Sequence, residues 1–378
     1  MTTVAAGIVD DLVALARIPA PTFFEQRRLE WLEQRLAAAP GRRTRDRAGN
    51  LLWTWGEDRP RLLLSAHVDT VFPADTPLDI QREGDELRGP GVGDNAAAIA
   101  VAISVLERLL AEEPLAAGGL AFTVAEEGLG NLRGAVAACE TLQPEAFIAL
   151  EGHGLDRVFV DAVGSIRARI TISGPGGHSW VDRGRPNAIH ALTEVAHDLL
   201  ARDAPESFVN IGGIAGGRSI NAIADEASLS IEARALDEFP LDRFLARLQQ
   251  LSVPRPLSLT LDSVGRRPAG RLPRTSALLQ AVRAARAELG LPDRLDAAST
   301  DANAALAQGI PALALGMAHG SNMHTLAERI DVDSLDTGRR QLELVVRRLL
   351  ADEGTVSRDD LGASRAGGPP RRGRRRRA

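Results

Sequence analysis

Short apolar runs typical of buried strands alternate with longer helical segments along the first part of the chain. The helical segments have apolar residues at intervals of three and four. In chain order the segments cover residues 4–18 and 25–39 (helices), 51–56 and 61–70 (strands), 95–113 (helix), 119–127 (strand), 132–142 (helix) and 146–152 (strand). This alternation predicts an α/β fold with a mixed, largely parallel sheet flanked by helices. Ligands of such sheets bind at the carboxyl ends of the strands.

The order of predicted strands and helices changes within residues 163–263. The order there is strand, helix, strand, strand, helix, strand, which predicts a ferredoxin-like βαββαβ unit. The α/β pattern then resumes with a helix, a strand (IPALALG) and a closing helix. We therefore expect a discontinuous main domain, residues 1–162 and 264–354, with a second domain inserted into it.

Residues 355–378 combine arginine with glycine and proline, which predicts a disordered tail. No aromatic residue accompanies these arginines, which argues against a nucleic-acid partner. No apolar run approaches the roughly 18 residues of a membrane span, and the first residues do not resemble a signal peptide. We expect no membrane partner and a cytoplasmic location.

Glu126 and Glu127 stand side by side where an apolar run, GGLAFTVA, ends. Adjacent carboxylates are costly where water is scarce, and a cation or a proton relieves the repulsion. One of the two could bind a metal while the other handles a proton. From these residues alone, a solvated pair of loop glutamates is the alternative.

Two further motifs place polar side chains at similar points. LLLSAHVDT ends a predicted strand with His67 and Asp69, and a carboxylate there can orient a ligating histidine or another nearby group. In GPGVGDN a glycine-rich turn leads through Asp94 into a helix. Asp94 fits either a helix N-cap or a metal bridge. A phosphate cradle is disfavoured, because the chain has no lysine and lacks the GxGxxG spacing.

The same kind of residue recurs later in the chain. AFIALEG ends in Glu151, and HGSNMHTLAERI contributes His319 and His324. The only cysteine is Cys139, so any metal site must use histidine and carboxylate. These recurring acidic residues and histidines exceed what solvation alone explains.

Together these motifs resemble the dinuclear zinc metallohydrolases that include aminoacylase, acetylornithine deacetylase, succinyl-diaminopimelate desuccinylase and glutamate carboxypeptidase. The resemblance covers nearly all of the chain before the tail and implies a zinc-peptidase-like catalytic domain with an inserted dimerisation domain. It also implies two divalent ions, zinc in relatives and open to cobalt or manganese from the donor atoms. The implied ligands are His67, Asp94 and Glu151 for one ion, and Asp94, Glu127 and His324 for the other.

The resemblance also implies roles beside the metals. In AEEG the first glutamate, Glu126, would be the general base, and Asp69 would support the ligand His67. Asp94 would bridge the ions, with a cis peptide bond to Asn95. His324 belongs to a His-x-x-x-Glu signature whose glutamate is Glu328.

The inserted domain carries further implied roles. GPGGHSW resembles a motif whose histidine, here His178, stabilises the oxyanion in the partner of a homodimer. GGRSINAIADEASLSIEAR resembles a segment whose Asn and Arg, here Asn221 and Arg234, hold the substrate carboxylate; a solvent-facing strand arginine is the alternative for Arg234. Outside the inserted domain, STDANAALAQGIPALALG resembles a family stretch beside the site, which implies that Asp301 and Gly316 lie near it, Gly316 as a substrate-binding residue. His153 and His319 match no ligand position and are expected to be nearby polar residues.

The implied activity is hydrolysis of a peptide or linear amide bond. In relatives a glutamate at the position of Glu151 accompanies acylases and carboxypeptidases, which favours a deacylase or carboxypeptidase acting on N-acyl amino acids or small peptides. An aminopeptidase or a di- or tripeptidase of the same family is the alternative. A non-enzymatic dimeric binding module is a third reading, against which the complete set of ligand residues argues.

Overall fold

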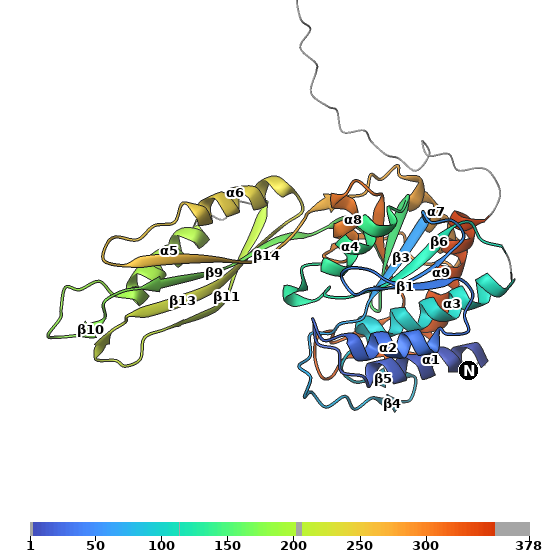
Figure 1. The fold of residues 1–378 in the computed structure, drawn as a ribbon, viewed down its shortest axis with the longest axis horizontal. Coiled ribbons are helices and arrows are strands. Elements are labelled where there is room, and N and C mark those ends of the chain that lie inside the picture. The colour runs from blue at the N-terminus through green and yellow to red at the C-terminus, as the bar shows by residue number, and fades with distance from the viewer. Residues whose placement is uncertain (1–2, 113, 202–205, 352–378) are drawn as a thin grey trace, which may run out of the picture.

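The computed structural model describes residues 3–112, 114–201 and 206–351. The predicted tail, residues 355–378, lies outside the described residues. The chain forms a compact α/β body and an elongated insert that projects from one side of it (Figure 1). Within the described ranges, no helix has the length and apolarity needed to cross a bilayer.

The main sheet is mixed, with parallel strands at its centre. Its strand order is β1-β2-β6-β3-β7-β17-β8-β15, and β16 also pairs with β8. β3 is parallel to both β6 and β7, and β17 is parallel to β7. The strands are β1 (Arg42–Arg45), β2 (Leu51–Trp55), β3 (Leu62–His67), β6 (Gly118–Thr123), β7 (Ala146–Glu151), β8 (Val158–Ala162), β15 (Gly270–Arg271), β16 (Leu295–Ala298) and β17 (Ala312–Gly316).

The central strands are apolar on both faces, which explains their continuous hydrophobic runs. Leu62 and Leu64 of β3 pack into a core with one set of helices, whereas Leu63 packs into a second core with another set. The first set comprises α1 (Thr3–Ala16), α2 (Gln26–Arg35), α3 (Ala98–Glu112), α7 (Ala277–Glu288) and α9 (Ser334–Leu350), and the second α4 (Arg133–Leu142) and α8 (Ala302–Ala307). The period-two alternation of strand side chains thus builds the predicted helix-flanked layers.

The predicted βαββαβ unit is present. It runs through β9 (Gly164–Ser173), α5 (Ala188–Ala201), β11 (Ser207–Gly216), β13 (Glu226–Ala235), α6 (Glu238–Gln249) and β14 (Ser258–Arg267). Its antiparallel sheet has the order β11-β13-β9-β14. A short ribbon of β10 (Gly177–His178) and β12 (Ala222–Ile223) lies at the far end of the insert (Figure 1). β14 continues past residue 263 to Arg267, and the exact division into domains stays a prediction.

A four-stranded sheet of very short strands was not expected from the sequence. It joins β18 (Gly320–Ser321), β19 (Arg329–Asp331), β5 (Glu86–Arg88) and β4 (Gln81–Glu83) in that order. β18 and β19 pair antiparallel and enclose a loop that contains His324. β5 and β19 bring this loop beside the turn that begins with Gly89 and leads to Asp94.

Gly338 in α9 provides a test of how tightly this body packs. A Cβ atom at Gly338 would lie 1.9 Å from the carbonyl oxygen of Met317, a contact with backbone. We therefore expect Gly338→Ala to lower the free energy of unfolding by about 1–3 kcal/mol through overpacking. Gly7→Ala in α1 is the matched control, because nothing lies within 4 Å of its added Cβ. The control should gain up to about 1 kcal/mol from helix propensity. Chemical denaturation measures both, and equal stabilisation by the two variants would contradict the packing.

Candidate metal centre and active site

The predicted metal ligands come together at the carboxyl ends of the central strands. His67 is the last residue of β3, and Glu151 is the last residue of β7. β6 ends at Thr123, so Glu126 and Glu127 follow the strand on a turn in which Ala125 has a φ of 56°. Asp94 lies in an irregular helical turn, Val92–Ala97, directly before α3. The Asp94–Asn95 peptide bond is cis, as the resemblance implied.

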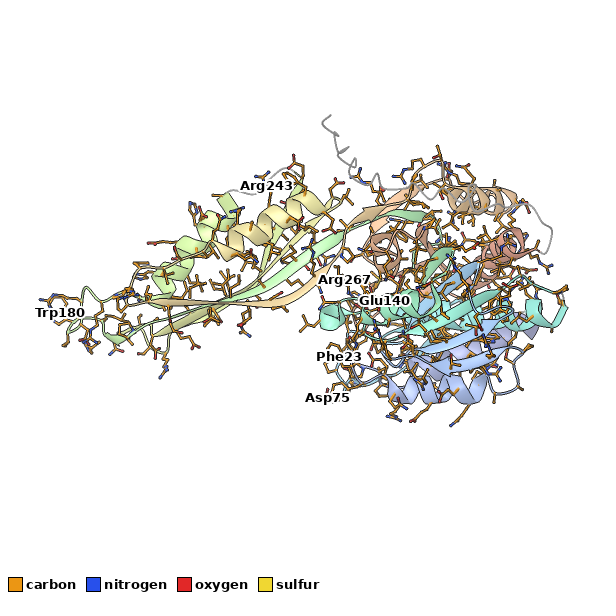
Figure 2. All side chains as sticks on the ribbon, turned by 45° about the horizontal axis from the view of Figure 1, so that its top comes forward. Phe23, Asp75, Glu140, Trp180, Arg243 and Arg267 are labelled. Carbon is orange, nitrogen blue, oxygen red and sulfur yellow. The ribbon has the colours of Figure 1, made fainter. Side chains whose placement is uncertain are left out.

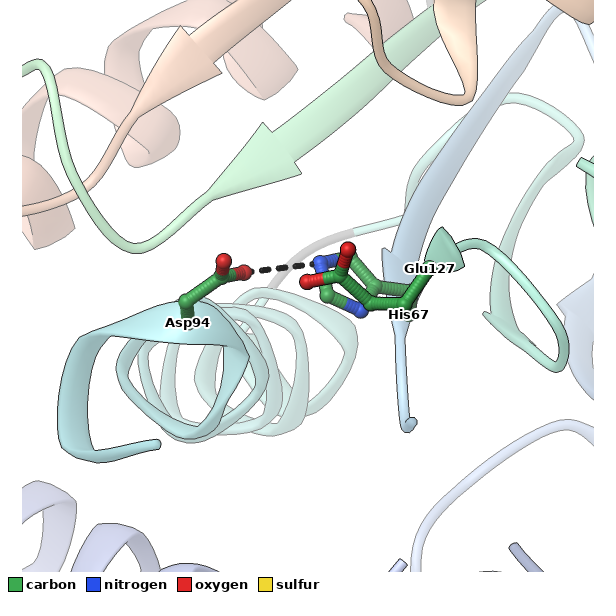
Figure 3. Close-up of side chains that lie close together, drawn as sticks. All are labelled: His67, Asp94 and Glu127. Carbon is green, nitrogen blue, oxygen red and sulfur yellow. Dashed lines mark ion pairs between the residues drawn. The ribbon is translucent and has the colours of Figure 1, made fainter. Parts of the chain in front are cut away.

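Asp94 lies between His67 and His324 and offers one carboxylate oxygen to each. Its Oδ1 atom is 2.9 Å from His67 Nε2, and its Oδ2 atom is 2.9 Å from His324 Nε2. Figure 3 shows Asp94 facing His67, with Glu127 beside the histidine. An N-cap role for Asp94 is not observed, since Gly91 occupies the N-cap of this turn and Asp94 lies inside it.

Of the other two candidate carboxylate ligands, Glu127 lies near His324 and Glu151 lies near His67. Glu127 Oε1 is 3.1 Å from His324 Nε2, and Glu151 Oε2 is 3.9 Å from His67 Nε2. The groups thus fall into two sets that share Asp94, the same two sets that the resemblance implied. Donor atoms of His67, Asp94 and Glu127 also lie within 4.8 Å of one another, close enough for one cation to reach all three. Imidazole nitrogens and carboxylate oxygens suit zinc, cobalt or manganese.

The charges of this cluster require compensation. Hydrogen bonds to Asp94 and Glu127 raise the pKa of His324 to about 10. Burial lowers the pKa of His67, yet its contacts with Asp69 and Asp94 dominate and raise it well above its ordinary value. Burial raises the pKa of Glu151 well above its ordinary value. The site therefore holds extra protons whenever no other positive charge is present, and divalent cations would displace them.

Asp69 holds the turn that carries the two glutamates. Its carboxylate accepts hydrogen bonds from the backbone amides of Glu126 (3.1 Å) and Glu127 (2.9 Å), and from the Thr22 hydroxyl (2.8 Å). Burial raises the pKa of Asp69, but the histidine and these amides outweigh it and hold the pKa below its ordinary value. The His67 ring contacts the backbone oxygen of Asp69 at 3.1 Å, closer than its carboxylate at 3.6 Å. Asp69 thus orients the glutamate turn as well as the histidine.

Glu328 fixes the turn that carries Asp94, as Asp69 fixes the turn that carries the two glutamates. Its fully buried carboxylate accepts the backbone amides of Gly91 (2.7 Å), Gly93 (3.2 Å) and Asp94 (2.9 Å). The His153 ring lies 2.7 Å from the same carboxylate. His153 is therefore a support of the Asp94 turn, in agreement with its expected place near the site but outside the ligand set.

Glu126 is buried beside the ligands and is not paired with either histidine. Arg267 Nη1 donates to Glu126 Oε1 at 3.0 Å, and Arg267 Nη2 donates to the Glu126 backbone oxygen. Burial raises the pKa of Glu126 to about 8, against the opposing charges of Arg267 and His67. A carboxyl with such a pKa can exchange a proton near neutral pH.

The cluster opens into a pocket of about 840 Å³. Arg157, Arg167, Arg234 and Arg267 contribute to its walls, together with the apolar side chains of Val71, Phe159 and Met323. Arg234 and Arg167 share Glu232 as a partner, each at 2.7 Å. His319 also lines the pocket. Arg234 thus lines the same pocket as the candidate ligands, and its predicted substrate-binding role stays a prediction.

Four predicted site residues do not line this pocket: Asp69, which supports the glutamate turn, and His178, Asn221 and Gly316. His178 is exposed on β10 at the far end of the insert, and Asn221 lies next to it, where its backbone oxygen accepts the Ser179 amide at 2.9 Å. In one protomer they are separated from the cluster, so their predicted roles require a second copy of the chain. Gly316 is buried at the end of β17, where an added Cβ would lie 2.2 Å from the carbonyl carbon of Gly154. Close packing against the 153–155 segment accounts for this glycine.

Arg267, Glu25 and Arg28 were not identified from the sequence. Each is buried, and each acts on a partner far away in the chain: Glu25 accepts the Ala125 amide at 3.0 Å, and Arg28 donates to the Val68 oxygen at 3.0 Å. Asp301, expected near the site, is buried and accepts a hydrogen bond from Thr123 at 2.6 Å. Arg28 stands among other charged residues in QRRLEWLEQR, so the sequence carries no signal that this one is buried.

Comparison with known proteins agrees with this geometry. Residues 63–348 match the sequence profile described as Peptidase family M20/M25/M40. A peptidase M20 domain-containing protein of Schizosaccharomyces pombe is 28% identical over 195 residues, which cover 49% of this chain and 48% of that protein. The chain therefore spans about half the length of this relative.

Solved structures with the same fold include two peptidases. A tripeptidase from Staphylococcus aureus has a TM-score of 0.75 at 22% identity, covering 91% of this chain and 98% of that one. A metallo-carboxypeptidase from Sulfolobus solfataricus has a TM-score of 0.73 at 14% identity, covering 90% and 99%. At these identities the likeness shows the fold alone.

The Asp69 support can be tested without an assay for activity. In Asp69→Asn the side chain keeps one acceptor oxygen for two backbone amides, so the turn of Glu127 should loosen. We expect zinc affinity to fall about 10- to 100-fold, as for other groups that orient metal ligands. Competition with a chromogenic chelator measures this affinity. Asp58→Asn, at an almost fully exposed carboxylate paired with Arg42, is the control and should leave it unchanged. Equal affinities in the two variants would contradict the assigned role of Asp69.

Proposed function

The chain belongs to peptidase family M20/M25/M40, and from this premise we propose that it is a metal-dependent hydrolase of peptide or linear amide bonds. The observation that carries the proposal is Asp94, which presents one oxygen to His67 and the other to His324. Beside this shared carboxylate lies Glu126, a buried carboxyl that pairs with neither histidine. A shared carboxylate and a separate acid–base group are the parts that a two-metal hydrolase needs.

We propose that His67, Asp94 and Glu151 hold one divalent cation and that Asp94, Glu127 and His324 hold the other. Zinc is the expected metal. Bound there, the cations would polarise the substrate carbonyl and make a water molecule easier to deprotonate. The protein's own part is to fix the backbone at Asp94 and Glu127, through the amides that donate to Glu328 and Asp69.

Glu126 is the proposed general base. Its side chain would take a proton from the attacking water and then deliver it to the departing amine, so one carboxyl serves both halves of the reaction. Burial favours this exchange because it raises the pKa of Glu126 to about 8. His178 of a second protomer is the proposed donor to the oxyanion, which makes a homodimer part of this proposal.

For the substrate we propose an N-acyl amino acid or a small peptide with a free carboxylate. Arg234 and Arg167 support this choice, because both line the pocket that contains the candidate ligands. Guanidinium groups bind carboxylates through paired hydrogen bonds. The pocket is also large enough for a small substrate, at about 840 Å³.

Replacing the proposed base tests this function. Glu126→Gln keeps the size of the side chain but cannot accept the proton, so we expect kcat to fall about 10²- to 10⁴-fold with metal content unchanged. Amine release from blocked N-acyl amino acids and from free di- and tripeptides measures turnover. Glu140→Gln is the control, since Glu140 is on the surface of α4 and pairs with Arg47.

Different results would redirect the proposal in defined ways. Turnover of free-amine peptides alone would favour an aminopeptidase. Near-normal turnover by Glu126→Gln with full metal occupancy would show that another group is the base.

A further inference from the structure

The turn that carries Glu126 and Glu127 touches both strands that connect the insert to the main body. These strands, β9 and β14, pair antiparallel where they leave the body, with Arg267 opposite Ser165. Figure 2 shows Arg267 at this junction, far from Trp180 at the other end of the insert. The residues 126–131 therefore contact the root of the insert as well as the main sheet.

Arg267 makes two of these contacts, both with Glu126. It is the last residue of β14, and it is 4% exposed. Its Nη1 atom donates to Glu126 Oε1 at 3.0 Å and lies 3.3 Å from Ser299 Oγ, while Nη2 donates to the Glu126 backbone oxygen. One planar guanidinium thus holds the side chain and the backbone of the same residue, which restricts the direction in which the Glu126 carboxylate can point.

Three further contacts join the same turn to the same strands. Arg167 of β9 donates to the Gly128 backbone oxygen, and Asn131 Nδ2 lies 3.4 Å from the Val264 oxygen of β14. Gly265 lies directly against this asparagine, because an added Cβ would be 2.1 Å from Asn131 Oδ1. β14 has its register irregularity between Ser263 and Gly265. A change in the direction of β9 or β14 would therefore be transmitted to the turn.

We propose that Arg267 is a positioning residue that links the insert to the general base: the orientation of β14 sets the direction of the Glu126 carboxylate. This inference rests on the proposed function of Glu126. Arg267 acts through Glu126. Arg234 has no such link. Its partner is Glu232, and among the hydrogen bonds of the described residues it has none with Glu126.

The test compares Arg267→Gln with Arg266→Gln. Arg266 is the preceding residue of the same strand, but it is exposed and pairs with Glu238 and Asp242 of α6, so its loss should have little effect. We expect Arg267→Gln to lower kcat about 10- to 100-fold while KM and metal content stay within about twofold, because misdirection of the base affects the chemical step. A kcat within about twofold of wild type would overturn the proposal.

Arg267→Lys separates positioning from charge. A lysine restores the buried positive charge but cannot bind two acceptors in the planar geometry of arginine. We expect this variant to fold and bind metal normally and to recover only part of the lost kcat. Full recovery would mean that charge alone is needed, which would overturn the positioning role. The lysine variant also keeps the test decisive if Arg267→Gln does not fold.

Hydrogen exchange provides a readout that does not depend on activity. In the metal-loaded protein, loss of Arg267 should speed amide exchange about tenfold or more across residues 126–131, since the turn loses both hydrogen bonds between Glu126 and β14. Arg266→Gln should leave this segment unchanged. Unchanged exchange in Arg267→Gln would overturn the link to the insert. If wild type hydrolyses no amide, the proposed function fails, and this measurement still decides whether the insert holds the turn.

Discussion

Several carboxylates lie close together at one end of the main sheet, and the arrangement of the residues around them depends on how this negative charge is balanced. Asp94, Glu126, Glu127 and Glu151 all line one pocket with His67 and His324, and most of them are buried. Such a group is stable only with added positive charge, from protons or from cations. Asp94 divides its oxygens between the two histidines, which supports the proposed pair of adjacent cations. The rest of the fold brings these side chains to one end of the sheet and fixes the distances between them.

Buried charged residues from other parts of the chain fix the backbone turns that carry Asp94 and the two glutamates. Asp69 and Glu328 bind the backbone amides of the two ligand turns, and Glu25 adds a third contact at Ala125. Arg28 of α2 is buried among them and binds the backbone oxygens of Ile18 and Val68. Burial lowers the pKa of Arg28 to about 10, while the charges of Asp69, Asp94 and Glu328 act in the opposite direction. These contacts fix the backbone of the two turns that carry the candidate ligands Asp94 and Glu127.

Sequence patterns predicted the layers, and they placed polar residues at the strand ends, because both depend on local periodicity; the ligand roles of those residues came from the resemblance to a known family. The strand β3 could be placed from its apolar run, and His67 follows from its last position. The βαββαβ order was equally visible. The small sheet that positions His324 was missed because its strands have two or three residues, too few for a pattern. Arg267 was missed for another reason: its partner Glu126 is 141 residues away, and only the folded chain brings them together. Gly316 was expected to contact substrate, whereas packing against residues 153–155 explains it.

The most direct test of a shared-carboxylate metal centre is anomalous X-ray diffraction from crystals of the zinc-loaded protein, measured on both sides of the zinc absorption edge. The account predicts two zinc peaks in each chain, one among His67, Asp94 and Glu151 and the other among Asp94, Glu127 and His324. A single peak, or two peaks that do not share Asp94, would contradict it.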